Sequence, residues 1–197
     1  MKKILKSLYD WVLSWAESPY GTLALFLLAF AESSFFPIPP DVLLIALAIS
    51  KSRRSFYYGF ICLIGSISGG MLGYFLGWQL MEAVGKPILN FYGVMDKFEY
   101  IGNLYRQYDA WAVGIAGFTP IPYKVFTISA GAFRINFVVF LIASAIGRGG
   151  RFFIVSGLIY IFGAKIKSFI DKYFNILSII LVILLIFGFV VIKFIIK

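Results

Sequence analysis

The chain has 197 residues, of which 61% are hydrophobic and 14% charged, so its composition lies far from that of a soluble globular domain. It contains no histidine and a single cysteine, Cys62, which excludes histidine-dependent catalysis, metal sites built from these residues and an internal disulfide. The net charge of +9 suits anionic lipid, whereas nucleic-acid binding is disfavoured because the charges are scattered between apolar runs. We therefore expect an all-α integral membrane protein that is not an enzyme and holds no cofactor or metal.

Residues 1–20 predict an amphipathic helix at the membrane interface. Apolar side chains recur at helical spacing from Ile4 to Trp15, beside a basic start, as in helices that lie in the plane of the interface. Asp10 and Glu17 interrupt the apolar run that a signal peptide requires.

Residues 22–50 form an apolar run that is interrupted at its centre by Pro37, Pro39 and Pro40. Each proline removes a backbone donor and clashes with the preceding turn, so a continuous helix is disfavoured. The segment after the prolines, residues 42–50, is too short to cross a hydrocarbon core of ~30 Å as a helix. We therefore predict a helical hairpin that enters the bilayer and turns back.

Residues 57–81 predict a membrane-spanning helix with glycine at every fourth position of one stripe. The glycines are Gly65, Gly69, Gly73 and Gly77. A stripe without side chains lets another helix approach closely, either within the chain, which we favour, or in a homo-oligomer. Residues 82–109 form the longest polar connection, in which apolar residues at helical spacing predict a second interfacial helix.

Residues 110–132 repeat the pattern of the first hairpin. The segment 118–125 is identical to 35–42 at five of eight positions, and we interpret the two as halves of an inverted repeat. The tip of the second hairpin contains Pro120, Pro122, Tyr123 and Lys124. The alternative for either segment is one spanning helix that is kinked at proline.

Two further spanning helices are predicted over residues 137–163 and 174–192, which makes about three in a single membrane domain over residues 21–197. Basic residues gather at the N-terminus, at 51–54 and at 165–172, whereas the long polar connection has more acids than bases. The positive-inside rule then predicts a cytoplasmic N-terminus and hairpins that enter from opposite faces.

Five ionisable residues lie at apparent membrane depth: Glu32, Asp41, Lys124, Arg148 and Arg151. Each costs roughly 2.5–3.5 kcal/mol at the centre of a membrane helix, so each is a candidate for function. Structural alternatives stay open. Asp41 suits the start of a helix after Pro40, and the two arginines can simply neutralise the two carboxylates.

With all five groups ionised, the three cations exceed the two carboxylates by one charge. This excess and the amide-rich N-termini of two half-helices suit an anion such as a phosphate, with Lys124, Arg148 and Arg151 as headgroup-binding residues. Removal from water disfavours a charged carboxylate, so Glu32 is predicted to be able to take up a proton. We expect protonation of Glu32 or Asp41 to be coupled to the passage of a lipid phosphate headgroup.

Three motifs carry a family resemblance: Glu32 followed by Phe-Pro-x-Pro-Pro-Asp, then Gly73-Tyr74, and Phe118-x-Pro120 leading to Ala130-Gly131. With these motifs the chain resembles the DedA family of bacterial inner-membrane proteins, which are relatives of the eukaryotic VTT-domain lipid scramblases. The resemblance implies two opposed re-entrant hairpins and transport of a lipid such as undecaprenyl phosphate or phosphatidylethanolamine, with protons or sodium as the driving ion. The acidic residues of the family correspond to Glu32 and Asp41.

The second hairpin departs from the family pattern. Many members carry two arginines flanking its proline, where this chain has Gly117 and Tyr123. Lys124 lies next to one of these positions, and Arg148 and Arg151 can supply the missing charge from the following helix. The Pro-Ile-Pro-Tyr-Lys sequence resembles a subgroup described as YqaA-like and leaves the substrate open. Two rival functions also stay open: a proton-coupled small-ion transporter and a structural protein of the envelope or division machinery.

Overall fold

The computed structural model describes residue 15 and residues 18–36, 38–107, 109–119 and 122–163. The predicted final helix over residues 174–192, Pro37, Pro120 and most of the predicted interfacial helix over residues 1–20 lie outside this part. Every element within it is a helix, which confirms the all-α class for the described residues.

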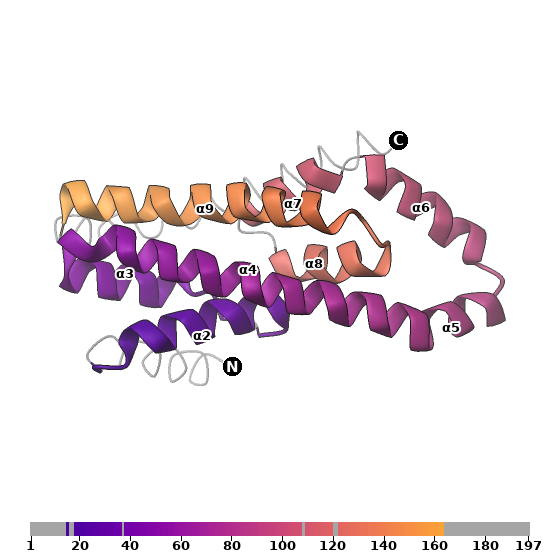
Figure 1. Ribbon diagram of the computed structural model, residues 1–197, viewed down its shortest axis with the longest axis horizontal. Coiled ribbons are helices and arrows are strands. Elements are labelled where there is room, and N and C mark those ends of the chain that lie inside the picture. Colours follow the sequence, from indigo (N-terminus) through magenta and orange to yellow (C-terminus); the bar gives the residue numbers. More distant parts are fainter. Residues whose placement is uncertain (1–14, 16–17, 37, 108, 120–121, 164–197) are drawn as a thin grey trace, which may run out of the picture.

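Two long antiparallel helices form the axis of the molecule (Figure 1). α4 (Ser55–Leu80) and α9 (Phe137–Phe162) each have 26 residues, which corresponds to about 39 Å of helix. Together with its flanking turns the first extends over Ser52–Phe91, and by length and composition both can cross a membrane. Their bounds lie within two residues of the spanning helices predicted at 57–81 and 137–163.

Two pairs of shorter helices pack on this axis and turn back near its middle (Figure 1). α2 (Gly21–Ser34) and α3 (Asp41–Ser50) lie along the first half of α4. α7 (Asp109–Phe118) packs on α9, and α8 (Tyr123–Ala132) packs on the second half of α4. Each proline-containing segment is therefore a pair of helices joined by a turn, and the two turns approach each other from opposite ends of the bundle.

Proline starts the second helix of each pair. Pro40 directly precedes α3 and Pro122 directly precedes α8, where a missing N–H costs little because the first amides of a helix have no intrahelical partner. The first helix of the first pair ends just before, since the N–H groups of Phe35 and Phe36 both donate to the carbonyl of Ala31 at 2.8 Å. The prolines therefore set where each chain reversal occurs.

The glycine stripe of α4 lies against two helices of the same chain. At Gly65 and Gly69 an added Cβ would collide with backbone carbonyls of α2, in the second case that of Phe30. At Gly73 and Gly77 it would collide with atoms of α8. Glycine thus lets both hairpins reach the backbone of α4, which brings their turns to the same level of the bundle.

The polar connection is largely helical and continues α4 beyond its predicted end at residue 81. A π-helical turn over Met81–Gly85 leads into α5 (Lys86–Phe91), where Pro87 is tolerated because it stands in the first turn. The chain then turns at Gly93, whose φ is 62°, into α6 (Met95–Gln107), which carries its apolar residues on one face. This amphipathic helix lies where the sequence predicted one.

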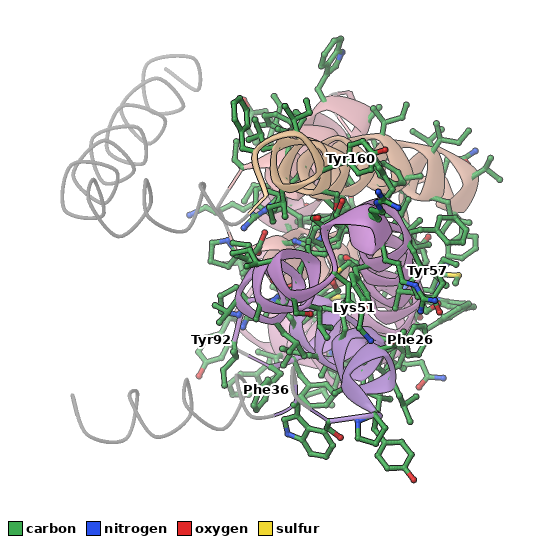
Figure 2. All side chains as sticks on the ribbon, turned by 90° about the vertical axis from the view of Figure 1, so that its left-hand side faces the viewer. Phe26, Phe36, Lys51, Tyr57, Tyr92 and Tyr160 are labelled. Atoms are coloured by element: carbon green, nitrogen blue, oxygen red, sulfur yellow. The ribbon has the colours of Figure 1, made fainter. Side chains whose placement is uncertain are left out.

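The end of the molecule at which α3 meets α4 carries exposed tyrosines beside basic residues. Tyr57 and Tyr160, labelled in Figure 2 together with Lys51, are about half exposed on α4 and α9. The 3-10 turn Ser52–Arg54 adds two exposed arginines at the same end. Aromatic and basic side chains of this kind are typical of the boundary between a bilayer and water.

The close approach at Gly69 predicts a stability effect of a single methyl group. We expect Gly69→Ala to cost about 1–3 kcal/mol through overpacking against the backbone of α2, and to lower the apparent melting temperature in detergent by several degrees. Gly157→Ala on α9 is the matched control, because its Cβ would lie 3.7 Å from the Phe56 ring, an ordinary contact. Equal melting temperatures for the two variants would contradict the packing described.

Candidate functional site

Arg148 lies in the middle of α9 and is only 2% exposed. Its Nη2 pairs with Oε2 of Glu32, near the end of α2, and also donates to Oγ of Ser33 at 3.2 Å. Its Nε donates to Oγ of Ser66 on α4 at 2.6 Å, and the two serine hydroxyls are 2.7 Å apart. The buried guanidinium therefore has a counter-charge and polar partners on two neighbouring helices, as a buried ion requires.

Two aromatic rings lie next to the same guanidinium. The Arg148 Cζ lies 4.8 Å from the ring centroid of Tyr123 and 4.9 Å from that of Phe152, within the range of cation–π attraction. The Tyr123 hydroxyl donates to Oγ of Ser144 at 2.5 Å, which fixes its ring. The sequence placed Tyr123 at the hairpin tip, and the structure adds its contact with the central arginine.

Arg151, one turn further along α9, joins the two hairpins. Its Nε and Nη2 donate to the two carboxylate oxygens of Asp41 at 3.1 and 2.7 Å, and its Nη1 donates to the carbonyl of Thr119 at 3.0 Å. Asp41 is the first residue of α3 and Thr119 directly follows α7. A single side chain thus links the turns of the two hairpins, through a bidentate ion pair with Asp41 and a hydrogen bond to Thr119.

Lys124, the second residue of α8, crosses between the hairpins in the other direction. Its Nζ donates to the carbonyl of Phe36 at 3.2 Å, and among the described residues no carboxylate pairs with it. Nearby, the Thr127 hydroxyl donates to the carbonyl of Ser33 at 3.2 Å. Of the three cations in the cluster, Lys124 is therefore the one whose charge is not neutralised by an ion pair.

The structure brings all five predicted ionisable residues to the two hairpin turns. Both arginines pair with carboxylates, which is the structural alternative that the sequence left open, while the surplus positive charge stays on Lys124. Sequence reasoning missed Ser33, Ser66 and Phe152 as partners of Arg148. Two consecutive serines directly after Glu32, in an otherwise apolar helix, were the sequence feature that could have indicated such polar partners.

Two apolar grooves border the charged cluster. One has a volume of about 460 Å³ and lies along α2, with Leu27, Phe36 and Leu43 in its lining. The other has about 620 Å³ and lies between α7 and α9, with Trp111 and Thr119 in its lining. Each groove thus includes the turn residue whose carbonyl receives a hydrogen bond from a cation, Phe36 from Lys124 and Thr119 from Arg151.

Residues 37–161 match the family described as VTT domain, which is more than half of the chain. The chain belongs to the VTT domain, or DedA, family. A relative from Haemophilus influenzae, itself uncharacterised, is 32% identical over 97% of this chain and 99% of its own length. An uncharacterised protein of Histophilus somni is 34% identical over 84% of this chain and 86% of its own.

A more distant relative of this VTT domain protein has a functional name. The undecaprenyl phosphate transporter A of Staphylococcus aureus is 28% identical over 66% of this chain and 68% of its own length. No solved structure matches the chain. Family membership and the two long apolar helices make it a membrane protein.

The buried ion pair predicts a non-additive effect on stability. Glu32→Leu or Arg148→Leu alone should cost about 3–5 kcal/mol, because each leaves an unpaired buried charge, whereas the double variant should recover most of that loss. Ser33 and Ser66 keep each other as partners in all three variants. Melting temperatures in detergent measure the cycle, with Lys86→Ala, which breaks an exposed pair with Glu82, as the control for a small effect. Additive losses would contradict the pairing.

Proposed function

We propose that this protein is a transporter of the bacterial cytoplasmic membrane that moves an anionic phospho-lipid, such as undecaprenyl phosphate or a phospholipid, between the two leaflets. The observation that carries the proposal is the cluster of three cations and two carboxylates at the turns of two opposed hairpins, in which Lys124 pairs with none of the described carboxylates. Charges at this depth are expensive and are retained where a pathway needs them.

In the proposed membrane frame, α4 and α9 span the bilayer and the hairpins re-enter it from opposite faces. Helices of 10 to 14 residues are about 15–21 Å long and reach only part of the way through a core of ~30 Å. Their turns then lie near the midplane, where irregular backbone is tolerated only if protein or a wet cavity surrounds it. The cytoplasmic face would be the end that carries Lys51 and the Ser52–Arg54 turn.

A lipid phosphate would use the cations of the cluster in a definite order. Lys124 is the first to bind, because its present partner is a neutral carbonyl. Arg151 can follow, since a phosphate presents the same fork of oxygen atoms as the Asp41 carboxylate that it now holds. Protonation of Asp41 would release Arg151 to the phosphate, which couples proton uptake to headgroup binding.

The grooves support a lipid over a small ion as the substrate. A phosphate at Lys124 or Arg151 has an apolar groove beside it, because Phe36 and Thr119 belong to both the cluster and the grooves. The acyl or prenyl chain of the lipid can lie there while its headgroup is held at the turns. The name of the Staphylococcus aureus relative supports the same class of substrate.

The first test measures translocation of undecaprenyl phosphate in proteoliposomes. We expect Lys124→Gln to reduce the initial rate by at least about tenfold, the loss of one charge-assisted hydrogen bond, and Lys124→Arg to restore much of it. Lys51→Gln, at the exposed end of α3, is the matched control for the loss of one lysine. If Lys124→Gln and Lys51→Gln move lipid at the same rate, the proposed role of Lys124 is wrong.

A second test addresses proton coupling. Asp41→Asn keeps the shape of the side chain but cannot take up a proton, so we expect lipid movement that no longer responds to a pH gradient. Asp96→Asn on the exposed side of α6 should respond as the unmodified protein does. Undiminished stimulation by the gradient in Asp41→Asn would assign the coupling to another group, and proton–cation exchange without lipid movement would favour the small-ion transporter.

A further inference from the structure

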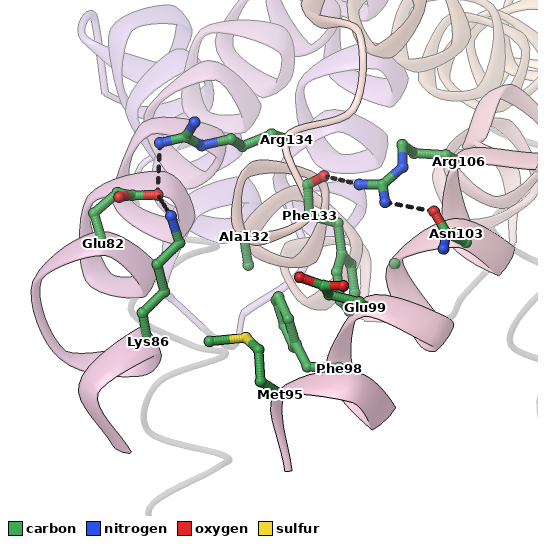
Figure 3. A pocket seen from close by; sticks show the side chains of 11 residues that line it. Glu82, Lys86, Met95, Phe98, Glu99, Asn103, Arg106, Ala132, Phe133 and Arg134 are labelled. Carbon is green, nitrogen blue, oxygen red and sulfur yellow. Dashed lines mark hydrogen bonds and ion pairs between the residues drawn. The ribbon is translucent and has the colours of Figure 1, made fainter. Parts of the chain in front are cut away.

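A polar pocket lies apart from the central cluster, at the end of the molecule where α5 and α6 lie (Figure 1), and Figure 3 shows its lining side chains. It has a volume of about 380 Å³, is open to the surface, and is lined by exposed and partly exposed side chains of α6, of the start of the π-helical turn and α5, and of the turn between α8 and α9. Its charged and amide lining residues are Glu82, Lys86, Glu99, Asn103, Arg106 and Arg134. A volume of this size suits a small polar group rather than a whole lipid.

The cations of this pocket are only partly neutralised. Glu82 Oε1 receives hydrogen bonds from both Arg134 Nη2 at 2.5 Å and Lys86 Nζ at 2.7 Å, so one carboxylate serves two cations. Within the part of the chain that the structure describes, Arg106 pairs with no carboxylate; it donates to the Phe133 carbonyl at 3.0 Å and to the Asn103 amide oxygen at 2.7 Å. The result is an unbalanced positive charge on guanidinium groups, which suit phosphate.

Glu99 adds a negative charge to the same pocket, beside its guanidinium groups. It lines the same pocket, as Figure 3 shows, and among the described residues it has no ion-pair or hydrogen-bond partner. An unpaired carboxylate in a pocket with surplus guanidinium charge suits a ligand that carries both a phosphate and an ammonium group.

The backbone at Arg134 points to a role for that side chain. Its φ is 52°, the left-handed region, and no other non-glycine residue in the described part of the chain has a positive φ. Arg134 follows the end of α8, where the N–H of Ile135 donates to the carbonyl of Ala130. Glycine is the usual residue in this conformation, so the arginine is there against the local backbone preference. Its side chain pairs with Glu82 and lies 5.7 Å from the Trp78 ring, which holds the guanidinium at the pocket.

The apolar part of the lining and the position of the pocket favour a lipid. Phe98 and Phe133 stack at 4.8 Å between ring centroids, and Met95 lies beside them. From Ser55 to Glu82 the helix rises by about 40 Å, close to the ~40–45 Å of a bilayer with its headgroups. With the start of α4 at one interface, the pocket therefore lies at headgroup depth on the opposite face.

We infer that this pocket binds the headgroup of an aminophospholipid, with the phosphate at Arg106 and Arg134 and the ammonium group at Glu99. This site is distinct from the transport cluster, and the inference does not depend on transport, because binding is measured on a protein at rest. A phosphate–amine group could also come from free phosphoethanolamine, and the depth of the pocket favours the lipid.

The test is a binding titration of the full-length protein in detergent with short-chain phosphatidylethanolamine, phosphatidylcholine and phosphatidylglycerol. We expect phosphatidylethanolamine to bind tightest, by about tenfold, because it alone of the three offers a phosphate together with an ammonium N–H donor. Glu99→Gln should remove this preference without weakening phosphatidylglycerol binding, whereas Arg106→Gln should weaken binding of every lipid. Asp96→Asn and Lys97→Gln on the same helix are the matched controls, since neither residue lines the pocket.

Glu99 makes no ion pair in the described part of the chain, so its substitution leaves the fold intact and keeps the test decisive if Arg106→Gln is unstable. Equal affinity for the three lipids, or an unchanged preference in Glu99→Gln, would overturn the inference. Free phosphoethanolamine that binds as tightly as the lipid would overturn the assignment to a lipid. If Lys124→Gln loses transport but binds lipid normally at this pocket, or if a variant loses binding at this pocket but transports normally, the inference and the proposed function are tested separately.

Discussion

The central constraint on this structure is that charges far from water must find partners inside the protein. Arg148 is almost completely buried, and its neighbours on three elements follow from that fact: a carboxylate and a serine on α2, a serine on α4, and a ring at the start of α8. Because a lone buried charge is so costly, these contacts hold the first hairpin, the second hairpin and both long helices at one level.

Glycine makes that arrangement possible. The ion pairs and hydrogen bonds at the centre of the bundle have short donor–acceptor distances. They form only because the backbones of α2 and α8 can lie directly on α4. A larger side chain at Gly69 or Gly77 would separate the helices and lengthen every polar contact above and below it. Backbone packing and charge pairing are therefore two parts of one structural solution.

The two hairpins are similar in sequence but not in charge, and this difference carries the proposed chemistry. Asp41 and Lys124 occupy corresponding positions at the starts of α3 and α8. Asp41 is neutralised by Arg151, whereas Lys124 reaches a carbonyl of the other hairpin. An internally repeated fold thus supplies the matching turns, and the departure from exact repetition supplies one surplus positive charge for an anion.

The sequence alone determined the helical class, the two long helices, the two proline turns and the five ionisable residues, because apolar length, proline geometry and the cost of buried charge act locally along the chain. It did not determine that helical structure continues past residue 81, through the π-helical turn into α5, since a proline in the first turn of α5 does not end a helix. Nor did it choose between arginines that are free to bind a headgroup and arginines that neutralise the two carboxylates. Only the tertiary structure decided the partners of Arg148 and Arg151, because residues more than 100 positions apart meet there, and no local pattern encodes such a contact.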